Sequence, residues 1–193
     1  MPPGTIILLN GASSSGKTSI LVELQHLFAE SYLNAGLDKF LWMLPSRYLD
    51  RPLWDDILGL ADHAGAAGHI LIAGMHQAIS ALARCGNNIV ADHVLVEKAW
   101  LRDCAVQFAD LPVYLIGIRC PLEILEQREC SRKDRTLGQA RLQHEIVHHH
   151  AIYDLEVDTS LLTPHECAER IITCVHSAPP QAFHRLKDSL DEI

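Results

Sequence analysis

One segment of the sequence has residue types and spacing suited to binding the phosphates of a nucleotide. Residues 11–18 read GASSSGKT and match the phosphate-loop pattern G-x-x-x-x-G-K-[ST] at every defined position. The two glycines permit backbone angles that direct successive N–H groups at an anion, while the lysine reaches the β and γ phosphates and the threonine hydroxyl binds Mg²⁺. We therefore expect ATP and Mg²⁺ as cofactors. The expected nucleotide contacts come from the whole loop, namely Gly11, Ala12, Ser13, Ser14, Ser15, Gly16, Lys17 and Thr18.

The segments on either side of this loop supply the structural context that a phosphate loop requires. Residues 5–10 (TIILLN) form a short apolar run with β-branched members, which is typical of a buried strand. Residues 17–29 then carry apolar side chains at helical spacing. The alternative, a serine-rich surface turn, leaves the lysine unexplained. The order strand, glycine-rich loop, helix therefore favours the phosphate-loop interpretation.

A cluster of basic residues further along the chain is a candidate lid. Residues 128–135 read RECSRKDR. In small P-loop kinases, arginines on a mobile lid exclude water and neutralise charge on the transferring phosphoryl group. We expect Arg128 to stack on adenine, and Arg132 and Arg135, on a lid over about residues 130–138, to act on the phosphates in catalysis. The alternative is a solvated helix end of mixed charge.

Two aspartates each follow a segment that is predicted to form a strand. Asp38 comes shortly after residues 32–36, and Asp92 closes residues 88–92 (NIVAD). We expect Asp38 to contact the substrate and to act as the general base that accepts the proton of an attacking hydroxyl. Asp92 is expected to orient Mg²⁺ or the substrate. For either aspartate, an N-cap of the following helix is the alternative.

The alternation of apolar strands with helical stretches predicts an α/β fold. Such strands form a parallel sheet that is covered on both faces, and ligands bind at the carboxyl ends of its strands. Strands are expected at residues 5–10, 32–36, 88–92, 113–119 and 153–158. Helices are expected at residues 17–29, 70–85, 97–108, 122–130, 139–149 and 164–176. We expect a single P-loop kinase domain over residues 1–178, followed by a tail, residues 179–193, that forms a short peripheral helix.

The composition argues against several classes of protein. Of the 193 residues, 48% are hydrophobic and 21% are charged, which suits a packed core better than a disordered chain. The 16 Lys and Arg residues oppose 24 Asp and Glu residues, so the formal charge of -8 repels nucleic acid and anionic membranes. Because no signal-peptide pattern and no apolar run of membrane-spanning length is visible, we predict a cytoplasmic protein.

Cysteine and histidine usage adds two further expectations. The 6 cysteines show no CxxC spacing, which predicts reduced thiols and neither disulfides nor structural zinc. Residues 148–150 are three consecutive histidines. Successive residues of a helix point about 100° apart, so these side chains would not converge on one ion. We interpret them as a polar helix end.

Several segments together resemble the chloramphenicol phosphotransferase family. They are TIILLNGASSSGKTSI at the start, AGLDKFLWMLP around Asp38, NIVADHVL around Asp92 and His93, IGIRCPLEILEQRECSRKDR, and HHHAIYDLEVDTS. The similarity extends over about residues 5–175, nearly the full chain. The ordered set of segments is much more specific than the phosphate loop, which by itself indicates only a P-loop NTPase.

The resemblance implies an activity and roles for particular residues. It implies transfer of the ATP γ-phosphoryl group to a primary hydroxyl of an antibiotic, which would inactivate the drug, on a five-stranded parallel sheet of the nucleotide-kinase type. It implies that Asp38 is the base, and that Arg135 faces the phosphates from the lid. Asp92 and His93, in the matching segment NIVADHVL, are assigned to the substrate side.

The family pattern is not followed over residues 46–69, and this leaves the acceptor open. The segment carries aromatic and acidic residues and would cover the acceptor pocket, so it sets what is phosphorylated. A cationic or sugar-like acceptor would fit as well as chloramphenicol. A metabolic kinase of a sugar, an acid or a nucleoside is one alternative, and a nucleotide-gated regulatory or binding protein is another. The oligomeric state is open too, a homo-oligomer included.

Overall fold

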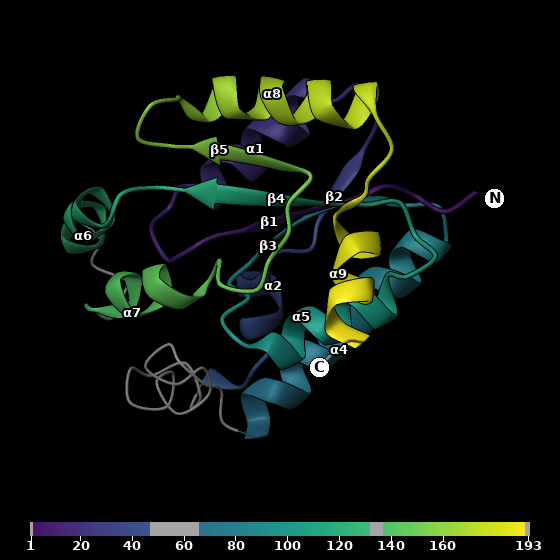
Figure 1. The fold of residues 1–193 in the computed structure, drawn as a ribbon, viewed down its shortest axis with the longest axis horizontal. Coiled ribbons are helices and arrows are strands. Elements are labelled where there is room, and N and C mark those ends of the chain that lie inside the picture. Colours follow the sequence, from purple (N-terminus) through teal and green to yellow (C-terminus); the bar gives the residue numbers. More distant parts are fainter. Residues whose placement is uncertain (1, 47–65, 132–136, 192–193) are drawn as a thin grey trace.

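A sheet of five parallel strands forms the centre of the structure, which is a computed structural model describing residues 2–46, 66–131 and 137–191 (Figure 1). The strand order is β2-β3-β1-β4-β5. The strands are β1 (Ile6–Asn10), β2 (Tyr32–Asn34), β3 (Asn88–His93), β4 (Val113–Arg119) and β5 (Leu155–Asp158). This confirms the predicted parallel sheet and puts β1, which leads into the phosphate loop, at its centre.

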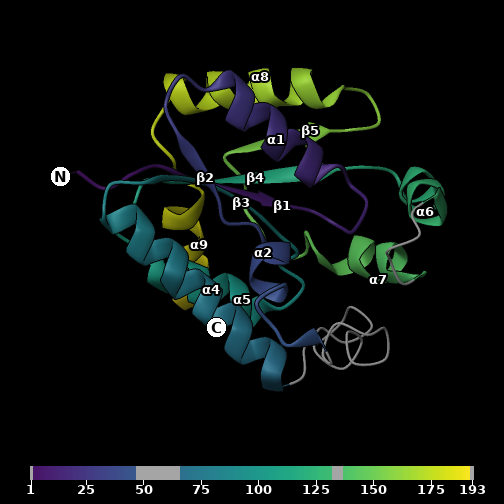
Figure 2. The same cartoon turned by 180° about the vertical axis from the view of Figure 1, so that it is seen from behind.

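Helices cover both faces of the sheet (Figures 1 and 2). One face carries α1 (Lys17–Leu27) and α8 (Pro164–Ser177). The other carries α2 (Leu37–Leu41), α4 (Ala66–Arg84), α5 (Lys98–Gln107) and α9 (Ala182–Asp191). Beyond the carboxyl ends of the strands lie α6 (Leu122–Ser131) and α7 (Gln139–Ile146). No helix in the described ranges is long and apolar enough to span a membrane.

The side chains of β1 explain why this strand lies at the centre of the sheet. Ile6 and Leu8 pack into the hydrophobic cluster under α4 and α5, whereas Ile7 and Leu9 pack into the cluster under α1 and α8. All four side chains are fully buried. A strand covered on both faces needs apolar residues on both faces, and residues 6–9 (IILL) meet that requirement.

Several element ends differ from those expected from the sequence. β2 stops at Asn34 because the Asn34 side chain accepts a hydrogen bond from the Gly36 N–H (3.1 Å) and turns the chain into α2. The helix α7 ends at Ile146, so the histidines of residues 148–150 lie beyond it, and their interpretation as a helix end is wrong. His148 contacts the Tyr153 hydroxyl at 2.6 Å, and burial lowers the pKa of its imidazole to about 4.

The predicted helix in the tail is present as α9, and it is part of the core. Phe183 packs edge-on against Phe108 with ring centroids 6.0 Å apart, and Leu186 is fully buried. An Asp154 oxygen accepts hydrogen bonds from the N–H groups of Gln181 (2.6 Å) and Ala182 (2.9 Å), which satisfies backbone donors at the start of the helix. The helix therefore extends the cluster under α4 and α5.

Replacing Leu186 should show that α9 belongs to the folded unit. We expect Leu186→Ala to lower the free energy of unfolding by about 2–5 kcal/mol, because it leaves a cavity in a packed cluster. Leu161→Ala is the matched control, since that side chain is 79% exposed and its loss should cost within about 0.5 kcal/mol. Urea unfolding measures both values. Equal unfolding midpoints for the two variants would show that α9 is not integrated in the core.

Candidate active site

The loop between β1 and α1 has the backbone geometry of a phosphate loop. Gly16 adopts a left-handed conformation (φ 92°) immediately before α1, and Ser14 also has a positive φ of 63°. At Gly11, a Cβ atom would lie 2.7 Å from the Ile118 carbonyl oxygen, closer than such contacts allow. Glycine is therefore required at both ends of the loop, as the motif predicts.

The polar groups of this loop suit an anionic ligand. The Lys17 ammonium is nearly buried and donates to the carbonyl oxygens of Gly11 and Ala12, both at 2.7 Å. The hydroxyl oxygens of Ser14 and Ser15 are buried and, among the described residues, have no hydrogen-bond partner. Buried hydroxyls without partners cost free energy, and phosphate oxygens at the loop would accept hydrogen bonds from them.

Thr18 and Asp92 form a pair of oxygen groups beside the loop. The Thr18 hydroxyl donates to Asp92 Oδ2 at 3.1 Å, although the two residues are far apart in the sequence. The other carboxylate oxygen lies against Gly36, where a Cβ atom would come within 2.0 Å of it. A hydroxyl and a carboxylate are ligands that suit Mg²⁺, which usually binds one or two protein carboxylates together with phosphate oxygens and water. The pair therefore fits the predicted metal role of both residues.

A cleft of about 600 Å³ opens above the phosphate loop and brings the predicted site residues together. Lys17, Asp38 and Asp92 all line it, with Asp38 in the first turn of α2. On the side of α2 and β3 the cleft has an apolar wall, which consists of Leu37, Leu41, Val94, Val96 and Trp100. Asp38 lies on the same helix as Leu37 and Leu41 of this wall, and its role as the general base stays a prediction.

Arg128 also lines the cleft and is linked to the phosphate loop through Thr159. Its guanidinium donates to the Thr159 hydroxyl (3.1 Å) and to the Thr159 carbonyl oxygen (2.9 Å). The same hydroxyl donates to the Ser15 carbonyl oxygen at 2.9 Å. Arg128 is therefore placed beside the nucleotide loop, and its stacking on adenine stays a prediction. Arg132 and Arg135 lie outside the described residues, as do residues 47–65 of the divergent segment.

His93, predicted to contact the substrate, lines the cleft but is fully buried. Its Nδ1 atom accepts a hydrogen bond from the Val94 N–H (2.8 Å), and its Nε2 atom lies 3.0 Å from Nε2 of His76. Burial and the neighbouring His76 lower the pKa of His93 well below its ordinary value, so the ring is neutral. Both ring nitrogens are thus engaged within the protein, and substrate contact by His93 stays a prediction.

Three polar residues near the site were missed in the sequence. Asn10 is fully buried, donates to Val147 and Tyr153, and accepts from the Leu95 N–H. Gln143 accepts from the N–H of Ser13 in the phosphate loop, at 2.6 Å.

The third missed residue, Glu129, is buried on α6, immediately before the predicted lid. It accepts hydrogen bonds from the N–H groups of Gly138 (2.8 Å) and Ala140 (2.9 Å). It thereby joins the end of α6 to the start of α7. Of these three residues, only Asn10 could have been identified from the sequence, as a polar residue that ends an otherwise apolar strand.

Comparison with known proteins adds a family and a fold. Residues 4–176 match the family described as chloramphenicol phosphotransferase-like protein. Relatives from two strains of Mycobacterium tuberculosis, provisionally named O-phosphotransferases, are 37% identical to this chain. The alignment covers 97% of this chain and 89% of each relative.

Solved structures with the same fold include P-loop kinases that act on small molecules. The Mycobacterium tuberculosis APS kinase, solved with AMPPNP and APS, has a TM-score of 0.63 at 15% identity, covering 92% of this chain and 100% of that chain. Shikimate kinase from Acinetobacter baumannii, solved with shikimate, has a TM-score of 0.60 at 11% identity, covering 92% of this chain and 94% of that chain. At these identities the likeness concerns the fold alone. The predicted nucleotide-kinase-like architecture is thereby confirmed.

The contact between Gly36 and Asp92 leads to a test of the metal pair. We expect Gly36→Ala to fold, since Gly36 has an ordinary extended conformation, but to push Asp92 away from Thr18. Binding of ATP in the presence of Mg²⁺ should weaken by about tenfold or more, while binding in EDTA should not change. Gly74→Ala is the control, because a Cβ atom at Gly74 meets nothing within 4 Å. Calorimetric titration would contradict the assignment if Gly36→Ala kept its Mg²⁺-dependent affinity.

Proposed function

We propose that this chain, which belongs to the chloramphenicol phosphotransferase-like family, transfers the γ-phosphoryl group of ATP to a hydroxyl group of a small molecule. Family membership and the kinase fold support a phosphotransferase that acts on small molecules. One observation supports the assignment of particular residues to this reaction. The phosphate loop, the Thr18–Asp92 pair and Asp38 all line a single cleft, so a nucleotide and an acceptor would meet there.

Nucleotide binding is assigned to the loop and to the residues that hold it. Backbone N–H groups of residues 11–18 and the start of α1 would bind the β and γ phosphates. Lys17 would exchange its contacts with the loop carbonyl oxygens for phosphate oxygens. Thr18 and Asp92 would hold Mg²⁺, which when bound neutralises charge on the phosphates. Arg128, beside Gly16, is proposed as the contact to the base of the nucleotide.

The transfer step needs a base on the acceptor side, and Asp38 is proposed for it. The acceptor oxygen attacks the γ phosphorus, the bond from phosphorus to the bridging oxygen breaks, and ADP leaves with the electron pair. The hydroxyl proton passes to the Asp38 carboxylate as the new phosphate ester forms. Because the apolar wall lies next to Asp38, it would pack against the body of the acceptor and exclude water from the reacting oxygen. Arg132 and Arg135 are proposed, from the sequence, to act on the transferring phosphoryl group.

The identity of the acceptor is the finer part of the proposal. An antibiotic bearing a primary hydroxyl group is the acceptor that the family name favours, and its phosphorylation would inactivate the drug. A metabolic kinase would use the same phosphate loop and base and would differ only in the residues that contact the acceptor. Both versions predict release of ADP that depends on a hydroxyl compound.

An ADP-release assay over a panel of hydroxyl compounds tests this function. The panel should contain chloramphenicol, other hydroxylated antibiotics, sugars, sugar acids and nucleosides, each with ATP and Mg²⁺. We expect at least one compound to stimulate ADP release, and mass spectrometry should find that compound with one added phosphoryl group. Lys17→Ala is the control and should abolish the release, because the ammonium neutralises charge on the transferred group. ATP binding without stimulation by any panel member would count against a small-molecule kinase.

Replacing Asp38 separates transfer from nucleotide binding. We expect Asp38→Asn to bind ATP and Mg²⁺ with normal affinity, because Asp38 is proposed to face the acceptor and lies outside the phosphate loop. Phosphoryl transfer should fall by a factor on the order of 10² to 10⁴, which is the usual contribution of a positioned general base. Paired ATP titrations and acceptor-dependent turnover measure the two effects. An unchanged turnover would make Asp38 a structural residue of α2 and pass the role of base to Asp92.

A further inference from the structure

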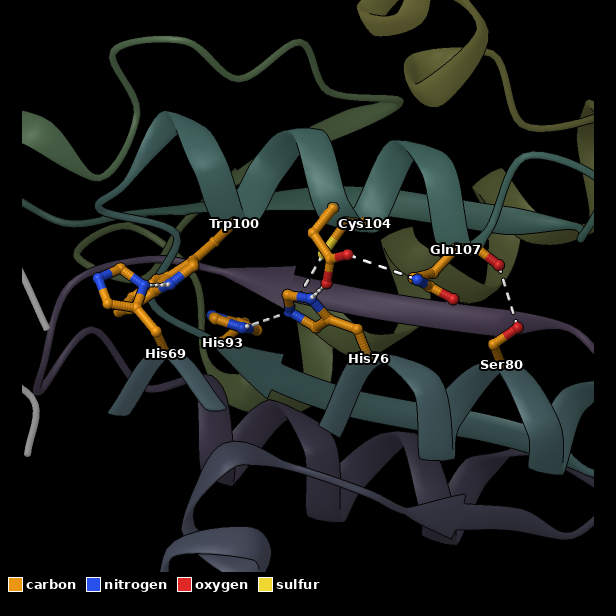
Figure 3. Close-up of polar contacts among 8 residues, drawn as sticks. His69, His76, Ser80, His93, Trp100, Cys104 and Gln107 are labelled. Atoms are coloured by element: carbon orange, nitrogen blue, oxygen red, sulfur yellow. Dashed lines mark hydrogen bonds and ion pairs between the residues drawn. The ribbon is translucent and has the colours of Figure 1, made fainter. Parts of the chain in front are cut away.

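A line of polar side chains runs from α5 through α4 to the end of β3 (Figure 3). Asp103 Oδ2 lies 2.5 Å from Nδ1 of His76, and Nε2 of His76 lies 3.0 Å from Nε2 of His93. Nδ1 of His93 receives the Val94 N–H at 2.8 Å. Both imidazoles are fully buried, whereas the Asp103 side chain is 32% exposed. We call this line the Asp103–His76–His93 relay.

Only one arrangement of protons satisfies this relay when both rings are neutral. The Val94 N–H is always a donor, so Nδ1 of His93 must accept and the proton of His93 must lie on Nε2. That proton is directed at Nε2 of His76, which must therefore be the acceptor. The proton of His76 then lies on Nδ1 and is donated to Asp103. Both imidazoles are fully buried, and burial disfavours the charged form of an imidazole.

The relay ends on the backbone that forms the cleft. Val94 follows β3 directly, and its N–H bonds the His93 ring and not a neighbouring strand. The His93 ring also lies against Trp100, with ring centroids 5.9 Å apart, and both Val94 and Trp100 belong to the apolar wall. A change in the tautomer of His93 would leave the Val94 N–H facing another N–H. The peptide or the ring would then have to move, and the apolar wall would move with it.

We propose that His76 and Asp103 are positioning residues for the acceptor: they hold His93 in one tautomer, which fixes the Val94 peptide and Trp100 in the apolar wall. The role in acceptor binding rests on the proposed function. The hydrogen bonds that fix the His93 tautomer and the Val94 peptide are independent of that function. Neither residue needs to touch substrate. Their effect is expected mainly on the acceptor, because the side-chain contacts of the relay end on Val94 and Trp100 of the apolar wall. The phosphate loop meets His93 through its backbone instead, where the Gly11 N–H donates to the His93 carbonyl oxygen at 3.4 Å.

Two variants of His76 separate its hydrogen bond from its volume. His76→Leu removes the acceptor for the His93 Nε2–H, whereas the side-chain oxygen of His76→Gln can replace that acceptor. Ser80→Ala is the matched control, since the Ser80 hydroxyl bonds the Gln107 carbonyl oxygen (3.0 Å) and so joins the same two helices away from His93 (Figure 3). If His76→Leu does not fold, Asp103→Ala and Asp103→Asn form a second pair at the partly exposed end. Asn keeps an oxygen that can accept from His76, and Ala does not.

Nuclear magnetic resonance of the protein without ligand tests the relay directly. In protein labelled with ¹⁵N, the ring nitrogen shifts should identify His93 with its proton on Nε2 and His76 with its proton on Nδ1. His76→Leu or Asp103→Ala should shift the Val94 amide resonance, while Ser80→Ala, His76→Gln and Asp103→Asn should leave it near its wild-type position. The opposite tautomers in the wild type, or an unmoved Val94 resonance in both disruptive variants, would overturn the proposal whether or not the protein is a kinase.

Steady-state kinetics with the panel compound that stimulates ADP release tests the consequence for the acceptor. We expect His76→Leu or Asp103→Ala to lower kcat/KM for that compound by about tenfold to a hundredfold, the usual cost of misplacing a bound reactant. The affinity for ATP should stay within about twofold, since only acceptor contacts change. An equal loss in Ser80→Ala would assign the effect to general packing of α4 on α5. If no panel compound stimulates the wild type, the proposed function fails, and the Val94 resonance still decides the relay.

Discussion

The parallel pairing of β1 with β3 is the constraint on which the site depends. Leu9 pairs with Asp92 and Asn10 with His93, so the phosphate loop leaves the sheet beside the carboxylate that faces Thr18. This register is itself a result of burial, because β1 is apolar on both faces and can lie only in the middle of the sheet. A shift of one residue between the two strands would turn Asp92 to the opposite face and separate it from Thr18.

Buried polar groups at the ends of β1 and β3 are hydrogen-bonded within the protein, and these bonds restrict the conformation of the loops that follow. Asn10 uses its amide group to hold Val147, Tyr153 and the Leu95 N–H, so one side chain joins the end of β1 to the chain after α7 and after β3. The His93 ring provides the partner for the Val94 N–H. Because unpaired buried groups are costly, these bonds specify one path for the loops that follow the strands. The cleft is therefore held in shape by buried polar residues outside the nucleotide motif.

The sequence predicted the fold and the backbone geometry of the phosphate loop, because both depend on local patterns. Apolar runs identified the strands, and the phosphate loop needs only consecutive residues. The pairing of Thr18 with Asp92 agrees with the metal role predicted for both. What the sequence did not predict depends on contacts between distant residues. Gln143 bonds a loop residue far from it in the chain, and His76 faces His93 only after α4 has packed against the end of β3. Such contacts leave no periodicity in a single sequence.

The close packing of Gly36 against Asp92 has a consequence for how proteins with this fold could diversify. Gly36 immediately precedes the helix that carries Asp38, and it leaves no room for a side chain between that helix and the Asp92 carboxylate. A mutation that shifted α2 to admit a different acceptor would therefore disturb the metal pair as well. Changes of specificity that preserve catalysis would then have to accumulate elsewhere, in side chains that border the acceptor without carrying Asp38. In an evolutionary lineage, Asp38 and the Thr18–Asp92 pair, the proposed base and the proposed metal ligands, would be inherited together while the surrounding residues vary.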